Sequence, residues 1–182
     1  VLVIADTRYA AEDAATMVEI DYDILPGAAD CKAALDGHAP LCHSGSTNNE
    51  GAKFTIGYGD VNAAFSDAYV THREEFWIHR GGGFAIENRA VLAEYDELDD
   101  LITIWSATQS PFLVKQNVVD MLGWESDQVR VIAPDVGGGF GPKTIYYVEE
   151  ALIPIVAKEL GRPVKWVEDR RENFLATNME RD

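Results

Sequence analysis

The feature that most constrains this chain is a glycine run, GGGFG at residues 137–141, followed directly by Pro142. The apolar residues 129–133 before it predict a strand, and the apolar spacing from residue 142 to about 160 predicts a helix. Glycines at such a junction let backbone N–H groups approach a ligand, because no Cβ stands in the way. The N-terminus of the following helix would add partial positive charge. The run therefore predicts either a binding loop for a polar or anionic ligand or a tight turn that needs glycine for packing.

Two nucleotide-binding motifs come close to this run, and both fail at Pro142. A P-loop requires G-x-x-x-x-G-K-[ST], and residues 137–144 match it except that proline replaces the glycine before Lys143. Proline removes one N–H from the phosphate cradle and fixes φ. The dinucleotide pattern G-x-G-x-x-G also has proline at its last position. A P-loop-like nucleotide-binding module remains only as an alternative.

Charge and composition exclude several partners. The 15 Lys and Arg residues are outnumbered by 31 Asp and Glu residues, which gives a net charge of −16. Such a surface repels phosphate backbones and anionic lipid, so neither nucleic acid nor a membrane surface is expected as a partner. Cys31 and Cys42 are too few for a disulfide framework and lie in no metal-binding CxxC motif. No apolar run reaches the roughly 18 residues of a membrane span.

Residues 1–59 predict the end of one domain and a connection to the next. Apolar residues at 1–5 and the alternation over residues 18–24 predict two strands, with a helix over residues 8–17 between them that Thr7 caps. This β-α-β unit is too small to stand alone, so residues 1–30 are interpreted as the C-terminal part of a domain. Residues 31–59 predict an interdomain connection with little regular structure. The abrupt ends of the sequence suggest an internal fragment of a longer protein.

Residues 60–182 predict a mixed α+β domain. The clearest helix spans residues 111–122, with Ser110 at its N-cap and Gly123 after its end. Its inward-facing residues are expected to be Val114, Val118, Met121 and Leu122. A short helix is expected over residues 60–68, and strands are expected over residues 69–79, 89–95, 101–107, 129–133 and 164–168.

Four segments, in order, resemble the large subunit of the molybdenum hydroxylases, the family of xanthine dehydrogenase, aldehyde oxidase and CO dehydrogenase. Residues 131–143, VIAPDVGGGFGPK, resemble the GGGFGxK segment of that family, and residues 107–111, ATQSP, resemble its (S/T)-x-Q-x-P step. Residues 161–173, GRPVKWVEDRREN, resemble its GRPVKWVEDRxEN segment. Residues 8–26 resemble the stretch that closes the preceding α/β hammerhead domain. The resemblance therefore implies an α+β fold: the end of a hammerhead domain, followed by the first part of a molybdopterin-binding domain.

The resemblance also implies a cofactor and residues that contact it. The cofactor would be molybdenum on molybdopterin, in the cytosine dinucleotide form common in bacteria. Phe140 and Gly141 would lie beside the metal with a backbone amide near an oxo ligand, and Gly138 and Gly139 would shape the loop. Gln109 is a further candidate contact, with the alternative that it is a buried glutamine bonding only to backbone. No residue of the chain would ligate the metal directly.

The implied reaction is the hydroxylation of aldehydes or N-heterocycles with water-derived oxygen. In the family the general base lies near the C-terminus of the subunit, which would fall beyond Asp182, so no catalytic residue is assigned here and the isolated polypeptide is expected to be inactive. Electrons would leave through 2Fe-2S clusters and FAD on partner subunits or domains, in a dimer of heteromers. The expected compartment is the cytoplasm, with the periplasm as the alternative. A non-catalytic scaffold subunit of the same fold is the second alternative function.

Three positions depart from particular branches of the family. A glutamine near the metal in xanthine dehydrogenases falls at Gly81 here, one in CO dehydrogenases falls at Ala90, and the acidic residue of the GGKE loop is replaced by Thr144. These departures disfavour xanthine and CO as substrates. The charged residues 169–172 are interpreted as an ion-pair network rather than as catalytic groups.

Overall fold

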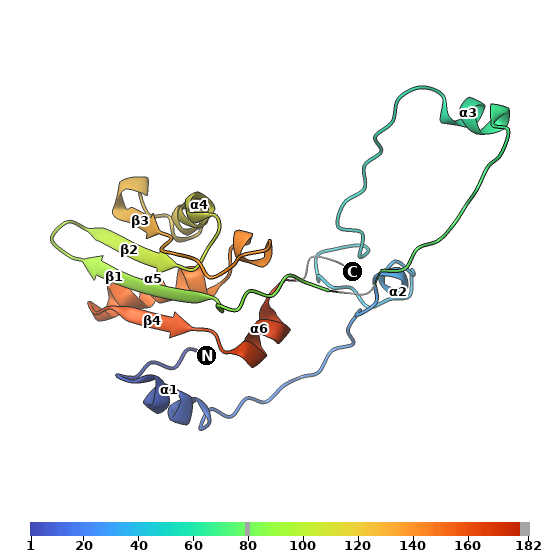
Figure 1. The fold of residues 1–182 in the computed structure, drawn as a ribbon. Helices are drawn as coiled ribbons and strands as arrows, with labels where there is room; N and C mark the ends of the chain where they lie inside the picture. Colours follow the sequence, from blue (N-terminus) through green and yellow to red (C-terminus); the bar gives the residue numbers. More distant parts are fainter. Residues whose placement is uncertain (79–80, 179–182) are drawn as a thin grey trace. The chain divides into compact units, whose positions relative to one another are not determined.

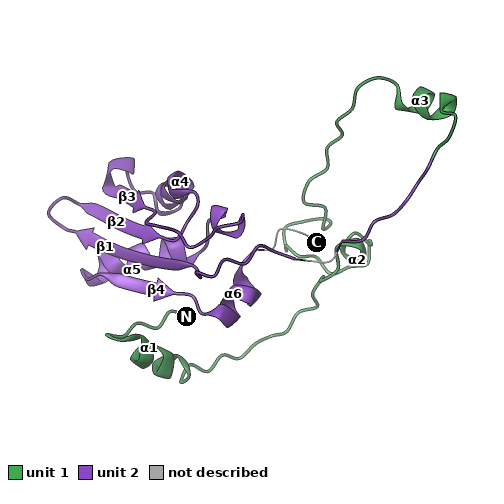
Figure 2. Ribbon diagram, in the orientation of Figure 1, with its two compact units in different colours: residues 1–71 green, residues 72–182 purple. Residues whose placement is uncertain are grey.

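The computed structural model describes residues 1–78 and 81–178 and divides the chain into two compact units, Val1–Thr71 and His72–Asp182 (Figure 2). Each unit is described by itself. Unit 2 holds the sheet and the glycine run, whereas the described secondary structure of unit 1 consists of three short helices. None of the helices in the described ranges is both long and apolar enough to cross a membrane.

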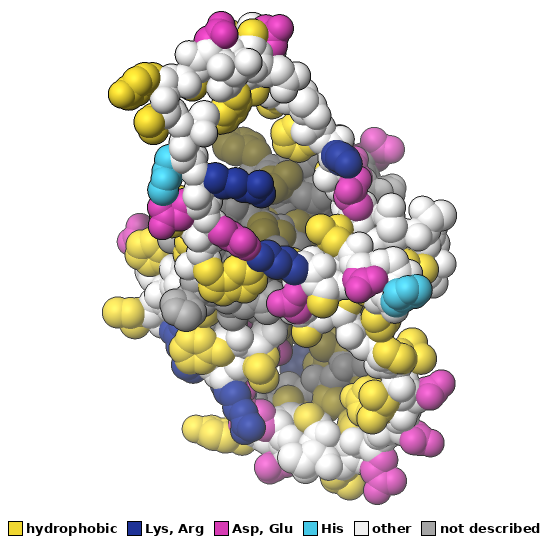
Figure 3. All heavy atoms as spheres, turned by 90° about the vertical axis from the view of Figure 1, so that its right-hand side faces the viewer, with side chains coloured by type: hydrophobic (Ala, Val, Ile, Leu, Met, Phe, Trp, Pro, Cys, Tyr) yellow, Lys and Arg dark blue, Asp and Glu magenta, His cyan; other side chains and the backbone are white. Residues whose placement is uncertain are grey.

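Unit 1 contains α1 (Arg8–Ala15), α2 (Cys31–Ala34) and α3 (Val61–Asp67) (Figure 1). The predicted helices over residues 8–17 and 60–68 are thus confirmed, and Thr7 Oγ1 caps α1 by accepting a 3.2 Å hydrogen bond from the Ala10 amide. The strands predicted over residues 1–5 and 18–24 are wrong. An extended segment becomes a strand only when a neighbour supplies hydrogen bonds, and neither segment pairs within the described residues. Many of their hydrophobic side chains are exposed, as are others on the face drawn in Figure 3.

Unit 2 is built on a four-stranded sheet with the order β3-β2-β1-β4. The strands are β1 (Ala90–Asp96), β2 (Leu101–Ser106), β3 (Val129–Ile132) and β4 (Val164–Val167). β1 runs antiparallel to β2 and β4, and β2 runs parallel to β3. In this register Val91 lies opposite Ser106, Ala90 opposite Val167 and Trp105 beside Ile132. The segments that precede β1 and follow β2, β3 and β4 therefore all leave the sheet at the same end.

Two helices, α4 (Pro111–Leu122) and α5 (Glu149–Leu160), pack on one face of this sheet (Figure 1). The core is formed by alternate strand residues and one stripe from each helix: Val91, Ala93, Ile102, Ile104, Val129, Val114, Val118, Ile153 and Ala157. The predicted bounds of α4 are confirmed, and Gly123 ends it in the left-handed conformation with φ 66°. Met121, expected to face inward, is instead 62% exposed, and Ser110 makes no side-chain capping bond.

Two other predictions about unit 2 are wrong. The helix expected from residue 142 is divided: a 3₁₀ turn, Pro142–Thr144, is followed by Ile145 in an extended conformation, and α5 begins only at Glu149. The strand expected over residues 69–79 finds no strand partner in its described part, and His79 lies outside the described residues. After β4 the chain forms α6 (Arg170–Ala176), which Asp169 caps by accepting from the Glu172 amide at 2.7 Å.

Candidate functional site: the glycine loop at the end of the sheet

The glycine run forms a loop directly after β3, and three of its glycines lie in close contact with neighbouring side chains. A Cβ on Gly137 would lie 2.6 Å from Glu87 Cβ, and one on Gly138 would lie 2.8 Å from the Phe140 ring. A Cβ on Gly139 would lie 2.2 Å from Gln109 Cδ. Since real Cβ atoms essentially never approach other heavy atoms within 3.0 Å, side chains at these positions would force the neighbours away.

The backbone of the loop repeatedly enters the left-handed region. Gly138 and Gly141 both have φ 99°, and Phe140, which has a side chain, has φ 56°. A non-glycine residue in this region carries a backbone cost of about 1–2 kcal/mol. Phe140 is also 60% exposed, so burial does not offset this cost within the described residues. Strain and exposure at one aromatic residue make Phe140 a candidate binding position.

Gln109 holds the loop from the side of β2. Its side-chain Oε1 accepts a hydrogen bond from the Gly141 N–H at 3.0 Å, and its backbone N–H donates to the Lys143 carbonyl at 3.0 Å. Thr108 Oγ1 donates to the same carbonyl, also at 3.0 Å. Gln109 is exposed, so the alternative of a buried glutamine is wrong in its burial, while the bond to backbone that it predicted is present.

Glu87 holds the loop from the segment before β1. One of its carboxylate oxygens, Oε2, accepts from the Gly137 N–H and from Lys143 Nζ, both at 2.7 Å. Burial raises the pKa of Glu87, but the hydrogen bonds from Lys143 and Gly137 outweigh burial, so its pKa lies below the ordinary value. The Lys143 side chain is only 4% exposed. Its amine is therefore engaged inside the protein and is not presented to a phosphate, as a P-loop would require.

The structure corrects the helix-dipole argument for this loop. Because α5 begins at Glu149, its N-terminus does not follow the glycine run directly, and only the 3₁₀ turn Pro142–Thr144 does. The turn is fixed by the Tyr147 hydroxyl, which donates to the Pro142 carbonyl at 2.7 Å. The hydrogen-bonding capacity of the loop therefore comes from its own amides.

A buried ion-pair network lies beside the loop at the same end of the sheet. The Arg89 guanidinium donates to Glu168 Oε1 through Nε at 2.9 Å and to Glu149 Oε2 through Nη1 at 3.1 Å. The Cζ atom of this guanidinium lies 3.8 Å from the centre of the Tyr147 ring. Glu168 is 1% exposed and also accepts from Asn173 Nδ2 at 2.7 Å. These bonds fasten α5 and α6 to the segments that flank β1 and β4.

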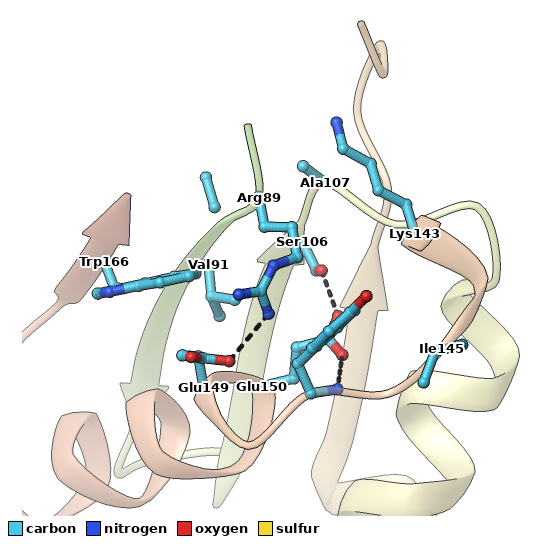
Figure 4. A pocket seen from close by; sticks show the side chains of 11 residues that line it. Arg89, Val91, Ser106, Ala107, Lys143, Ile145, Glu149, Glu150 and Trp166 are labelled. Atoms are coloured by element: carbon cyan, nitrogen blue, oxygen red, sulfur yellow. Dashed lines mark hydrogen bonds and ion pairs between the residues drawn. The ribbon is translucent and has the colours of Figure 1, made fainter. Parts of the chain in front are cut away.

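A pocket next to this network is lined by Arg89, Ser106, Lys143, Glu149, Glu150 and Trp166, among others (Figure 4). Glu150 accepts from Ser106 Oγ at 2.6 Å and from the Tyr147 amide at 3.0 Å. Burial raises the pKa of Glu150 above its ordinary value despite these two bonds. The Lys143 side chain extends away from the two glutamates (Figure 4), which agrees with its bond to Glu87.

The sequence analysis did not predict the acidic residues of this site: Glu149 and Glu168 in the ion-pair network and Glu87 beside the loop. The ion-pair network was expected at residues 169–172, but its acidic members are Glu168 and Glu149, and Asp169 acts as a helix cap. Arg170 bonds to Asn173 Oδ1 at 3.0 Å and to the Ile86 carbonyl. Glu87 and Gly137 lie 50 residues apart, so no local spacing could have revealed that they meet. All five predicted cofactor contacts lie together: Gln109, Gly138, Gly139, Phe140 and Gly141.

Comparisons with known proteins show which family shares this sequence and fold. The model of the molybdopterin cofactor-binding domain matches residues 42–182. The large subunit of nicotine 6-hydroxylase from Paenarthrobacter nicotinovorans is 39% identical over 176 residues, covering 97% of this chain and 21% of that protein. The CO dehydrogenase large chain of Hydrogenophaga pseudoflava is 34% identical over 194 residues, covering 100% of this chain and 24% of that protein.

Solved structures of molybdenum hydroxylases also match this chain. Quinoline 2-oxidoreductase from Pseudomonas putida 86 superposes with a TM-score of 0.87 at 32% identity, covering 96% of this chain and 22% of that one. The chain thus spans between a fifth and a quarter of the length of these relatives. The resemblance seen in the sequence is confirmed: the chain belongs to the molybdopterin cofactor-binding domain family of the molybdenum hydroxylases.

Proposed function

We propose that the glycine loop is one wall of a molybdenum-cofactor site, contacted through Phe140, Gly141, Gly138 and Gly139 and braced by Gln109. The observation that carries this proposal is Phe140: its φ is 56° and the residue is 60% exposed, although it is held between glycines. Among the hydrogen bonds of the described residues, none uses the Phe140 N–H, whereas the amides of Gly137 and Gly141 are both engaged. An amide donor next to an exposed aromatic ring suits a ligand that offers a hydrogen-bond acceptor to the amide and an apolar surface to the ring.

The residues of the loop fit an oxygen-bearing metal cofactor. Backbone N–H groups stabilise a negatively polarised oxygen without competing for the metal, because they donate and cannot ligate it. The cofactor, when bound, would supply the oxygen-transfer and redox chemistry. The loop would orient that cofactor through the Phe140 amide, and the Phe140 ring would exclude water from one side. No residue of this chain is assigned as a metal ligand or as the general base.

We further propose a substrate class and a context for the complete protein. Two of the similar proteins are named for N-heterocycles, nicotine and quinoline, which supports hydroxylation of N-heterocycles or aldehydes with water-derived oxygen. The cofactor would be the cytosine dinucleotide form, and electrons would pass to 2Fe-2S clusters and FAD on partner subunits or domains in a dimer of heteromers. The compartment would be the cytoplasm. The isolated 182-residue polypeptide would be inactive.

A domain assignment accompanies this function. Residues 1–30 would be the C-terminal part of a hammerhead-type domain, residues 31–59 the interdomain connection and residues 60–182 the first part of the molybdopterin-binding domain. The extended, exposed segments over residues 1–5 and 18–24 support it, since they have the apolar pattern of strands and pair with no strand among the described residues.

Metal and pterin analysis of the full-length protein tests the proposal. The protein is purified from a host that makes the cofactor, and molybdenum is measured by elemental analysis and pterin by fluorescence after its release. We expect both in a constant ratio to protein. A full-length protein free of both would overturn the proposal and favour the scaffold alternative, and ATP binding that Lys143→Met abolishes would favour the nucleotide alternative.

A further inference from the structure

We propose that Glu87 is a positioning residue of the cofactor site, which fixes the glycine loop through a clamp with buried Lys143. The inference rests on the proposed function, because it concerns how the Phe140 amide is presented to the cofactor. The contacts through which Glu87 would act are those with Gly137 and Lys143.

The clamp ties the two ends of the loop to one atom. Glu87 Oε2 accepts from the Gly137 N–H, where the loop begins, and from Lys143 Nζ, just after the loop ends, both at 2.7 Å. The Glu87 N–H also donates to the Gly137 carbonyl at 3.4 Å. A Cβ at Gly137 would lie 2.6 Å from Glu87 Cβ, so the backbone approaches this side chain as closely as only glycine permits. The ends of the loop are therefore fixed relative to each other.

Gln109 completes the support from the opposite strand. It accepts from Gly141 N–H at 3.0 Å, and its side chain fills the space that a Cβ on Gly139 would take. Together Glu87 and Gln109 engage the amides of Gly137 and Gly141, at the two ends of the run, and none of the hydrogen bonds of the described residues uses the Phe140 N–H between them. Such outer supports set the orientation of groups that touch a metal centre, and their loss typically costs about 10- to 100-fold in metal affinity or activity.

The exposure of the two partners predicts an asymmetric response to mutation. The Lys143 side chain is 4% exposed and that of Glu87 is 39% exposed. Glu87→Gln leaves a buried ammonium group without its counter-charge, which is strongly unfavourable. Lys143→Met leaves a half-exposed carboxylate that water can solvate and that still accepts from Gly137. The double variant Glu87→Gln/Lys143→Met removes both charges and keeps an acceptor oxygen, so it guards against a loss of folding.

The test uses the full-length protein with its partner subunits, produced in a host that makes the cofactor. For each variant, molybdenum content and the Mo(V) electron paramagnetic resonance spectrum of the loaded fraction are measured. The matched control is Lys158→Met, which removes a half-buried ammonium group that pairs with Asp100 at 3.2 Å and lies over the Tyr95 and Trp124 rings. We expect Glu87→Gln to lower molybdenum content about 10-fold or more and to change the spectrum of what remains, with smaller losses in Lys143→Met and the double variant, and wild-type behaviour in the control.

The possible outcomes separate the two proposals. Wild-type protein without molybdenum would refute the proposed function itself. Loaded wild type together with normal content and an unchanged spectrum in Glu87→Gln would refute the clamp alone. If Glu87→Gln and the double variant both showed the same lowered molybdenum content with an unchanged spectrum, positioning would also be refuted, because this result would show only a loss of folded protein.

Discussion

Gly139→Ala should loosen the glycine loop by displacing the Gln109 side chain. An added Cβ would lie 2.2 Å from Gln109 Cδ and 2.3 Å from Cγ, so the glutamine has to move. Its movement breaks the 3.0 Å hydrogen bond from Gly141. The φ of Gly139 is not positive, so the backbone conformation itself accepts alanine. Overpacking costs about 1–3 kcal/mol, and because Gln109 is exposed and can swing outward, we expect about 2 kcal/mol in total, including about 1 for the lost hydrogen bond.

Hydrogen exchange measured by mass spectrometry on the full-length protein would detect this change. Peptides that cover the loop after β3 report its local opening. Since 1.4 kcal/mol is a tenfold change in an equilibrium, a loss of about 2 kcal/mol should speed exchange roughly 30-fold in these peptides. Gly45→Ala serves as the control, because an added Cβ there meets nothing within 4 Å.

A double-mutant cycle isolates the steric cause. Gln109→Ala alone loses the hydrogen bond and should speed exchange about fivefold. In the double variant the space left by Gln109 receives the new methyl group, so exchange should be no faster than in Gln109→Ala alone. Effects that simply add would refute the reasoning, since additivity is the behaviour of residues that do not touch.

Two further predictions concern buried carboxylates and are read from thermal unfolding of the full-length protein against pH. Glu168→Gln should cost about 3–5 kcal/mol, because it leaves Arg89 buried without its main partner. Burial raises the pKa of Glu168, but the bonds from Arg89 and Asn173 outweigh burial, so its pKa lies below the ordinary value. The stabilisation that Glu168 contributes is therefore fully present above the carboxyl pKa of the unfolded chain and is lost as the pH falls through the pKa of the folded protein. Wild type and variant should therefore converge in acid; a constant difference would contradict the pairing. Glu150→Gln should behave oppositely, because burial raises the pKa of Glu150 and the ionised carboxylate therefore costs stability at neutral pH. The variant should be at least as stable as wild type at neutral pH and should have no advantage in acid. A large loss at neutral pH would show that the charge of Glu150 is needed.

Most of unit 2 could be predicted because its elements carry local signals. The helix α4 has proline at its first position, a left-handed Gly123 after its end and an apolar stripe, and these fix its bounds without any tertiary information. The strands β1 and β2 show the alternation that one buried face imposes. The segments before residue 31 show similar alternation, but a strand also needs a partner, and its sequence cannot say whether one is present.

The candidate site was predicted only where its chemistry is local. The glycines and Phe140 stand together in the sequence, so their pattern was readable. The boundary of α5 was not, because Ile145 fits a helical stripe and yet takes an extended conformation, while Glu150 bonds to the Tyr147 amide and to Ser106 on β2. Those contacts depend on the sheet being in place.

The sheet topology explains why residues so distant in sequence can brace one loop. In an antiparallel pair the start of one strand lies beside the end of the other, so Glu87, before β1, and Gln109, after β2, emerge together. Because β3 runs parallel to β2, the loop that follows it emerges at the same end. The loop is thus held by side chains from the segments next to β1 and β2, and these side chains brace the strained backbone of Phe140. A strained residue persists only where its surroundings over-determine its conformation, and Glu87 with Gln109 supply that constraint.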